Sequence, residues 1–249
     1  MQPLLYLAEA IRRLKRVHFS GIVNIPRQGP ALIAAQHSSP LDLFYLLSLM
    51  RAAGRRDHRF IMAAEMVDEH MFRPYVQAAI RGGAPRLAWW SGLLARVGSR
   101  IVPPLLRPLH PIPVYRKGDD RAARQESLRW LLEGHVLTIA PGSGNHSQRD
   151  SNGMRPLRHG VASLARRFFD ATQEPLAVIP LGLSGRGMRF PTYVRIGKPF
   201  NGMSDRHYPA LFSRAGQENE AIKQQVYQDF TRQLAHRIAR LCWCLSTVG

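Results

Sequence analysis

Two patterns of apolar residues recur along this chain: short apolar runs that end in turn residues, and longer segments in which apolar residues recur at helical spacing. Apolar runs bounded by Gly, Pro or charged residues predict buried strands. Such runs occur at residues 31–35, 59–64, 112–115, 136–140, 177–183 and 193–197. Segments with apolar residues at every third or fourth position predict helices instead. These lie at about residues 3–18, 43–50, 121–132, 159–169 and 222–241.

The alternation of strands and helices predicts an α/β fold with a central mixed, mainly parallel sheet that is flanked by helices. A chain of 249 residues is long enough for one such domain with a sizeable core. We therefore predict a single domain over residues 21–249, preceded by an N-terminal basic amphipathic helix within residues 1–20. Ligand sites in such sheets lie at the C-terminal ends of strands.

The N-terminal segment combines an apolar stripe with basic residues. Its apolar positions at helical spacing are Leu4, Leu7, Ile11 and Leu14. Basic residues cluster in the second half, a pattern typical of helices that lie in a membrane interface. A helix that packs on the domain and exposes its basic face to solvent fits the same pattern, so both interpretations stay open.

Residues 87–109 form a second apolar segment, which begins with Trp89 and Trp90. Arginines and a pair of prolines interrupt it, which argues against a membrane-spanning helix. Tryptophan is enriched at membrane interfaces, so contact with a membrane is one interpretation. A helix pair buried in the core is the other.

The charge balance favours an anionic partner. The chain has 35 Lys and Arg against 17 Asp and Glu, a formal net charge of +18. A phospholipid surface and nucleic acid both fit such a charge. No nucleic-acid motif occurs, and aromatic residues do not alternate with basic ones, so we expect no nucleic-acid partner. Cys242 and Cys244 have no second pair to complete a zinc site, and we expect no metal centre.

His37 and Asp42 follow the first predicted strand and carry the candidate chemistry. Ser39 fits an N-cap and Pro40 the first helical position, which places Asp42 at the third position, facing back toward His37. A carboxylate that orients an imidazole lets its other nitrogen accept a proton from an alcohol. The same residues also fit an ordinary helix start with no chemistry.

The sequence "GIVNIPRQGPALIAAQHSSPLD", residues 21–42, resembles the opening block of the glycerolipid (lysophospholipid) acyltransferases, which include 1-acylglycerol-3-phosphate acyltransferases. In that family His-x4-Asp is the catalytic motif, so the resemblance implies that His37 is the base and Asp42 its orienting partner. The segments "PIPVYRKGD", "LLEGHVLTIAPGSGNHS", "AVIPLGL" and "VRIGKPF" are similar to later blocks in the same order. The resemblance implies that Arg116 contacts an acceptor phosphate.

The third block departs from the family pattern of Pro-Glu-Gly-Thr-Arg-Ser. The chain has Pro141, Gly142, Ser143, Gly144, Asn145, His146 and Ser147 there. Ser143 or Gly142 replaces the glutamate, and His146 replaces the arginine. A carboxylate and a guanidinium group that can bind phosphate in a bidentate way are therefore lost. Backbone N–H groups of Ser143, Gly144 and Asn145 can still bind phosphate or an oxyanion.

Together these features predict an O-acyltransferase that moves a fatty acyl group from acyl-CoA or acyl carrier protein to a lysophospholipid such as 1-acylglycerol-3-phosphate. No bound cofactor is expected, because the thioester is a co-substrate. The expected location is the cytoplasmic side of an anionic membrane, as a peripheral protein. A neutral lipid alcohol as acceptor, and a non-catalytic lipid-binding relative, remain the alternatives.

Overall fold

The computed structural model describes residues 2–36, 41–83, 89–115, 120–142, 156–184, 191–213 and 219–243. Its contacts divide the chain into two compact units, a smaller one of residues 59–127 and a larger one of residues 2–58 and 128–249. The prediction of a single domain over residues 21–249 stays a prediction.

The larger unit holds a mixed, mainly parallel sheet with strand order β1-β7-β6-β2-β5. Of the adjacent pairs, β1 and β7, β6 and β2, and β2 and β5 are parallel, whereas β6 and β7 are antiparallel. Its strands are β1 (His18–Ser20), β2 (Ala31–Ala35), β5 (Val136–Ile139), β6 (Ala177–Ser184) and β7 (Tyr193–Ile196). All five residues of β2 are buried, as expected for a strand in the middle of a parallel sheet.

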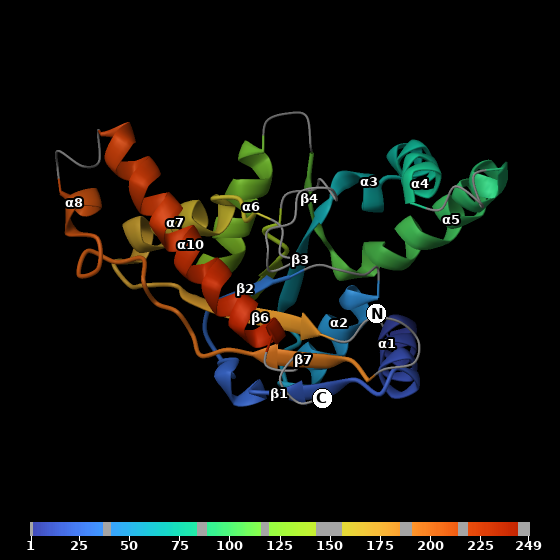
Figure 1. Cartoon of the computed structure of the whole chain (residues 1–249), viewed down its shortest axis with the longest axis horizontal. Helices are drawn as coiled ribbons and strands as arrows, with labels where there is room; N and C mark the ends of the chain where they lie inside the picture. The colour runs from blue at the N-terminus through green and yellow to red at the C-terminus, as the bar shows by residue number, and fades with distance from the viewer. Residues whose placement is uncertain are drawn as a thin grey trace. The chain divides into compact units, whose positions relative to one another are not determined.

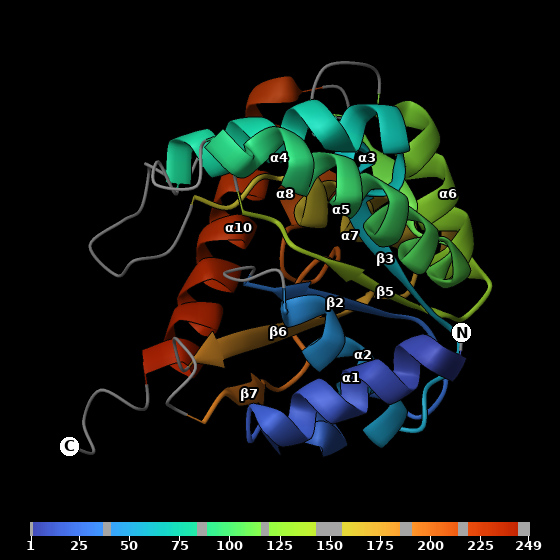
Figure 2. The ribbon, with the colours of Figure 1, turned by 90° about the vertical axis from the view of Figure 1, so that its right-hand side faces the viewer.

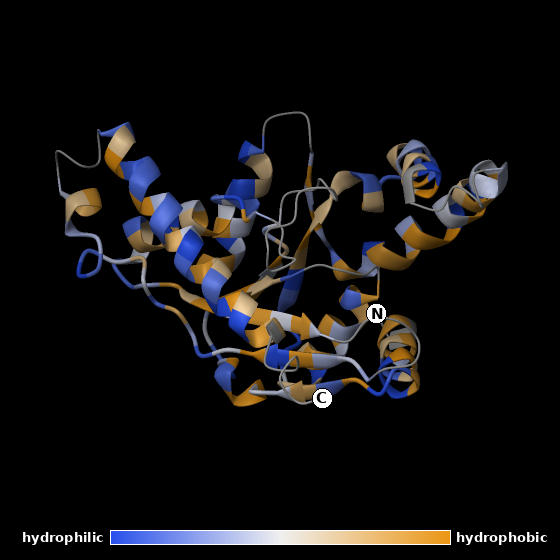
Figure 3. Cartoon of the chain, in the orientation of Figure 1, coloured by the Kyte–Doolittle hydropathy of each residue, from blue (hydrophilic) through white to orange (hydrophobic). Residues whose placement is uncertain are grey.

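Helices flank this sheet, so the predicted α/β fold is confirmed. Helix α10 runs across β6, and α1 lies beside α2 (Figures 1 and 2). The helices of the larger unit are α1 (Gln2–Leu14), η1 (Ile22–Asn24), α2 (Asp42–Ala52), α7 (Gly160–Thr172), α8 (Pro209–Phe212) and α10 (Glu220–Trp243). Coloured by hydropathy, the central strands are largely apolar (Figure 3).

The N-terminal segment forms the predicted helix, but its buried face differs from the predicted stripe. Leu4 and Ala8 are buried, whereas Leu7 and Leu14 are exposed. The helix ends at Leu14 because Arg16 adopts a positive φ of 48°, which turns the chain into β1. Contact between α1 and α2 means that one face of α1 packs on the larger unit.

The smaller unit contains a parallel strand pair and a helical pair. Strands β3 (His58–Ala63) and β4 (Ile112–Val114) are parallel, with Ile61 opposite Ile112. Its helices are α3 (Ala64–Val67), α4 (Glu69–Gly83), α5 (Ser91–Leu106), η3 (Arg107–Leu109) and the first part of α6 (Arg121–Leu132). Residues 69–83, for which the sequence pattern predicts no element, form α4 with Pro74 inside it.

Glycine lets the end of α10 approach β6 closely. A Cβ added to Gly182 would lie 2.6 Å from Leu241 Cβ and 2.8 Å from the Leu241 carbonyl carbon. Neither atom is the tip of a flexible side chain, so the helix would have to shift. We therefore expect Gly182→Ala to lower the free energy of unfolding by about 1–3 kcal/mol, the usual cost of overpacking.

Chemical denaturation of the two proteins measures this difference. Gly160→Ala is the matched control, because a Cβ there meets nothing within 4 Å and the residue lies in helix α7. The control should leave stability unchanged or raise it slightly. Equal stability of Gly182→Ala and wild type would contradict the close contact between α10 and β6.

Candidate functional site at the C-terminal edge of the sheet

Three neighbouring parallel strands end at the same edge of the larger unit's sheet. Strand β2 lies between β5 and β6, with Ala34 opposite Ile139 and Ala35 opposite Leu181. The chain leaves β2 into residues 36–42 and leaves β5 into residues 140–146. The predicted base and the predicted glycine-rich turn therefore follow adjacent strands at the edge where open α/β sheets bind ligands.

Asp42 is the first residue of α2 and is only 3% exposed. The backbone N–H groups of Phe44 and Tyr45 donate to the Leu41 carbonyl, at 3.0 and 3.3 Å, so the helix starts just before Asp42. Asp42 thus occupies the first helical position and not the third. A carboxylate in the first turn is stabilised by the positive end of the helix dipole.

Tyr45, on the same helix as Asp42, interacts with both Asp42 and Thr192. The Tyr45 and Thr192 side chains are hydrogen-bonded, and both residues are buried. Burial raises the pKa of Tyr45, and the negative charge of Asp42 raises it further, against the opposing effect of the Thr192 hydrogen bond. The phenol therefore keeps its proton. Sequence reasoning missed both residues, although Tyr45 lies three positions after Asp42 and so on a neighbouring part of the helix surface.

Gln36, the residue before His37 in the chain, is held from two directions. Its backbone N–H donates to the Leu181 carbonyl at 3.2 Å, and its side-chain Oε1 accepts from the Cys242 thiol at 2.7 Å. Burial raises the pKa of Cys242, so the thiol stays protonated and can donate. The end of α10 thereby fixes the end of β2.

The other predicted site residues lie outside the described residues. These are His37, Arg116, Ser143, Gly144, Asn145 and His146, and the cap residues Ser39 and Pro40 lie there too. The predicted pairing of His37 with Asp42, the phosphate contact of Arg116 and the role of the turn at 143–146 stay predictions.

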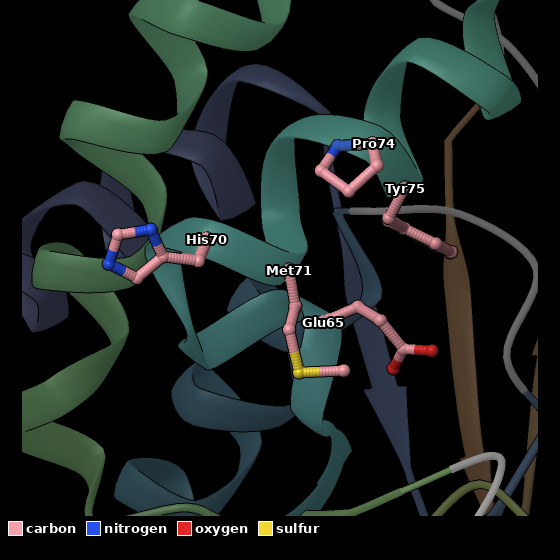
Figure 4. Close-up of a pocket in the computed structure, with 5 residues that line it drawn as sticks. All are labelled: Glu65, His70, Met71, Pro74 and Tyr75. Carbon is pink, nitrogen blue, oxygen red and sulfur yellow. The ribbon is translucent and has the colours of Figure 1, made fainter.

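A depression of about 400 Å³ in the smaller unit offers a second location for chemistry. Its lining residues are Glu65, His70, Met71, Pro74 and Tyr75. Glu65 and His70 are the titratable acid and base among them, but they point away from one another with Met71 between them (Figure 4). Glu65 and His70 are therefore not arranged as an acid–base pair.

Within the described ranges, no group of three or more His, Cys, Asp or Glu side chains could hold a metal ion. The same part of the chain contains no helix that is both long enough and apolar enough to cross a bilayer.

Comparisons with known proteins agree with the resemblance at the first motif. A family model described as Acyltransferase matches residues 16–81, which include both His37 and Asp42. This match confirms the resemblance inferred from the sequence. Among solved structures, the chain is similar to that of the 1-acyl-sn-glycerophosphate (LPA) acyltransferase PlsC from Thermotoga maritima, with a TM-score of 0.44 and 13% identity over 93% of this chain and 80% of that one. No curated protein matches the chain.

Proposed function

Because a family model described as Acyltransferase matches residues 16–81 of this chain, we propose that the protein transfers a fatty acyl group from an acyl thioester to a hydroxyl of a lysophospholipid such as 1-acylglycerol-3-phosphate. The acceptor oxygen bonds to the thioester carbonyl carbon while its proton passes to His37. The tetrahedral intermediate then breaks its carbon–sulfur bond, and the thiol leaves with that proton. The products are an ester and a free thiol.

The observation that carries this proposal is a buried carboxylate at the start of the helix that follows a central parallel strand. Asp42 lies five residues after His37 and opens the helix that follows β2. Carboxylates are seldom fully buried unless paired. A carboxylate in this position can orient the imidazole and stabilise its protonated form during transfer.

The acceptor is the part of the proposal that depends on Arg116 and on the turn at 143–146. Arg116 would hold the acceptor phosphate, because a guanidinium matches phosphate in a bidentate way. Ser143, Gly144, Asn145 and His146 would contact the acceptor or the oxyanion. The loss of the family's Glu and Arg in this turn favours a neutral lipid alcohol as the second candidate acceptor.

The donor would be acyl-CoA or acyl carrier protein, with no bound cofactor. The substrates are lipids, and the chain carries a formal net charge of +18. A peripheral position on the cytoplasmic face of an anionic membrane, without a nucleic-acid partner, fits both facts.

Incubation with a labelled acyl thioester and a panel of lipid alcohols tests the proposal. The panel contains 1-acylglycerol-3-phosphate, other lysophospholipids, diacylglycerol and an isoprenoid alcohol, and mass spectrometry identifies the ester. We expect 1-acylglycerol-3-phosphate to be acylated fastest. Faster acylation of a neutral alcohol would reassign the acceptor, and no ester with any member would contradict acyl transfer.

A further inference from the structure

Helix α5 has two faces of opposite character. Its inner face packs on α4 and consists of small buried residues, Ser91, Ala95 and Ser99. A Cβ added to Gly98 would lie 3.0 Å from the Phe72 ring, so the two helices approach closely. The contact with α4 fixes which side of α5 faces outward from this pair.

The outward face carries a continuous apolar row, which we call the α5 stripe. It consists of Trp89, Trp90, Leu93, Leu94, Val97 and Ile101, each between 41% and 76% exposed. From Trp90 to Ile101 the spacing follows the helix repeat, so the side chains form one row on one side of the helix. The ribbon of α5 is correspondingly rich in apolar colour (Figure 3). Single exposed apolar residues are ordinary, but a contiguous row indicates a contact surface.

Cationic side chains border the stripe. Arg96 and Arg100 are exposed on the same helix, and α5 contains no acidic residue. The Arg73 Nε on α4 donates to the Ser99 Oγ at 2.9 Å, which anchors this side chain beside α5. Arg73, Arg96, Gln77, Gly92 and Leu93 line a depression of about 390 Å³. Leu93 belongs to both features, so the stripe continues into a depression that two arginines flank.

An apolar row that begins with two tryptophans and is bordered by arginines matches the layers of a phospholipid interface. Apolar side chains enter the boundary of the acyl chains, tryptophan rings lie at headgroup level, and basic residues contact lipid phosphates. A second copy of this chain fits less well, because two apposed stripes would bring like-charged arginines together.

We propose that the α5 stripe docks on the surface of an anionic phospholipid bilayer, with Arg73 and Arg96 binding lipid phosphate in the adjoining depression. The inference deepens the proposed function by naming the surface that meets lipid. Bilayer binding is measured without turnover, so either proposal can fail without the other.

Flotation of the full chain with vesicles tests the docking surface. Vesicles of phosphatidylcholine with about 30% phosphatidylglycerol are compared with phosphatidylcholine alone; the anionic vesicles should bind the protein at least tenfold more tightly. The triple variant Leu94→Ser/Val97→Ser/Ile101→Ser should bind the anionic vesicles at least tenfold more weakly. The double variant Arg73→Gln/Arg96→Gln should lose about fivefold for each charge and become less sensitive to salt.

The matched control is Leu7→Ser/Leu14→Ser, which removes exposed apolar side chains of α1 outside the smaller unit. It should bind vesicles more tightly than the triple variant. Thermal melting confirms that each variant folds, and the charge variant tests the surface even if the triple variant does not fold. Unchanged vesicle binding by both α5 variants, or loss only in the control, would overturn the proposal. The proposal would also be overturned if the wild-type protein did not bind vesicles and instead dimerised through the α5 stripe.

Activity on a water-soluble, short-chain acceptor separates the two proposals. The triple variant should keep wild-type turnover on such an acceptor while losing activity on acceptor embedded in vesicles. Vesicle binding without any turnover in the wild type would contradict the proposed function and leave the docking surface supported.

Discussion

Replacement of His37 by alanine should lower kcat for acyl transfer by about 10²–10⁴-fold, the usual contribution of a general base. Without the imidazole, no positioned group in this mechanism takes the proton of the acceptor hydroxyl. Steady-state kinetics with the best acceptor of the panel measure the loss. The KM for the thioester should change little, because the base acts on the hydroxyl in the transition state.

The control for this experiment is His236→Ala, which removes an exposed histidine from α10 in the same unit. Its kcat should equal that of the wild type. Thermal melting should show both variants folded. An active His37→Ala protein would remove the mechanism and favour the non-catalytic, lipid-binding alternative.

Asp42→Asn distinguishes a positioning role from a merely structural one. The amide keeps the shape of the carboxylate but cannot stabilise a protonated imidazole. We expect a lower kcat and an acid limb of the kcat/KM profile at lower pH than in the wild type, because that limb reports on the essential base. A proportional loss at every pH, with the acid limb unmoved, would assign Asp42 a structural role.

Elements with strong local patterns could be predicted from the sequence. Residues 31–35 form the predicted strand β2, and residues 121–132 form the predicted helix α6. Strand β1 was missed, because three residues carry no period and its partner β7 lies about 175 residues further along the chain. Helix α4 was also missed, because Pro74 interrupts a sequence that otherwise suits a helix.

For residues 87–109, tertiary contacts that the sequence does not encode locally exclude a fully buried helix pair. One face of α5 is buried against α4 while the opposite face is exposed, and contact with a membrane stays a prediction. Tertiary contacts of this kind also occur at the sheet edge. The candidates His37 and Asp42 follow from residue types and spacing, whereas the contact between Gln36 and Cys242 spans 206 residues and has no local pattern.

A second large effect is expected at Asp57, which pairs with the buried guanidinium of Arg55. The Arg55 Nε and Nη2 donate to the two Asp57 carboxylate oxygens at 2.8 and 2.6 Å. Other guanidinium hydrogens bind the carbonyls of Pro26 at 2.8 Å and Gly29 at 3.0 Å. The Arg55 side chain is only 2% exposed, so the pair fastens the loop before β2 to the segment before β3.

Asp57→Asn should lower the free energy of unfolding by about 3–5 kcal/mol, because it leaves a buried cation without its counter-charge. The double variant Arg55→Met/Asp57→Asn should lose less stability than Arg55→Met and Asp57→Asn lose in sum, because the double variant no longer carries the buried charge. Denaturant unfolding measures all three proteins. Glu220→Gln, in an exposed ion pair with Lys223, is the control and should change stability little.

The acid dependence of stability provides an independent check on the same pair. Burial alone would raise the pKa of Asp57, but the Arg55 hydrogen bonds and charge, together with His135, outweigh it and hold the pKa below its usual value. The folded carboxyl therefore binds its proton less readily than the unfolded one. The pair stabilises the protein above the unfolded pKa of about 3.9 and loses this contribution as the pH falls through the folded value. At pH 7, Asp57→Asn should have a lower free energy of unfolding than the wild type, and this difference should shrink below about pH 4. A difference that stays constant from pH 7 to below about pH 4 would mean that the protonation of this carboxyl does not depend on Arg55.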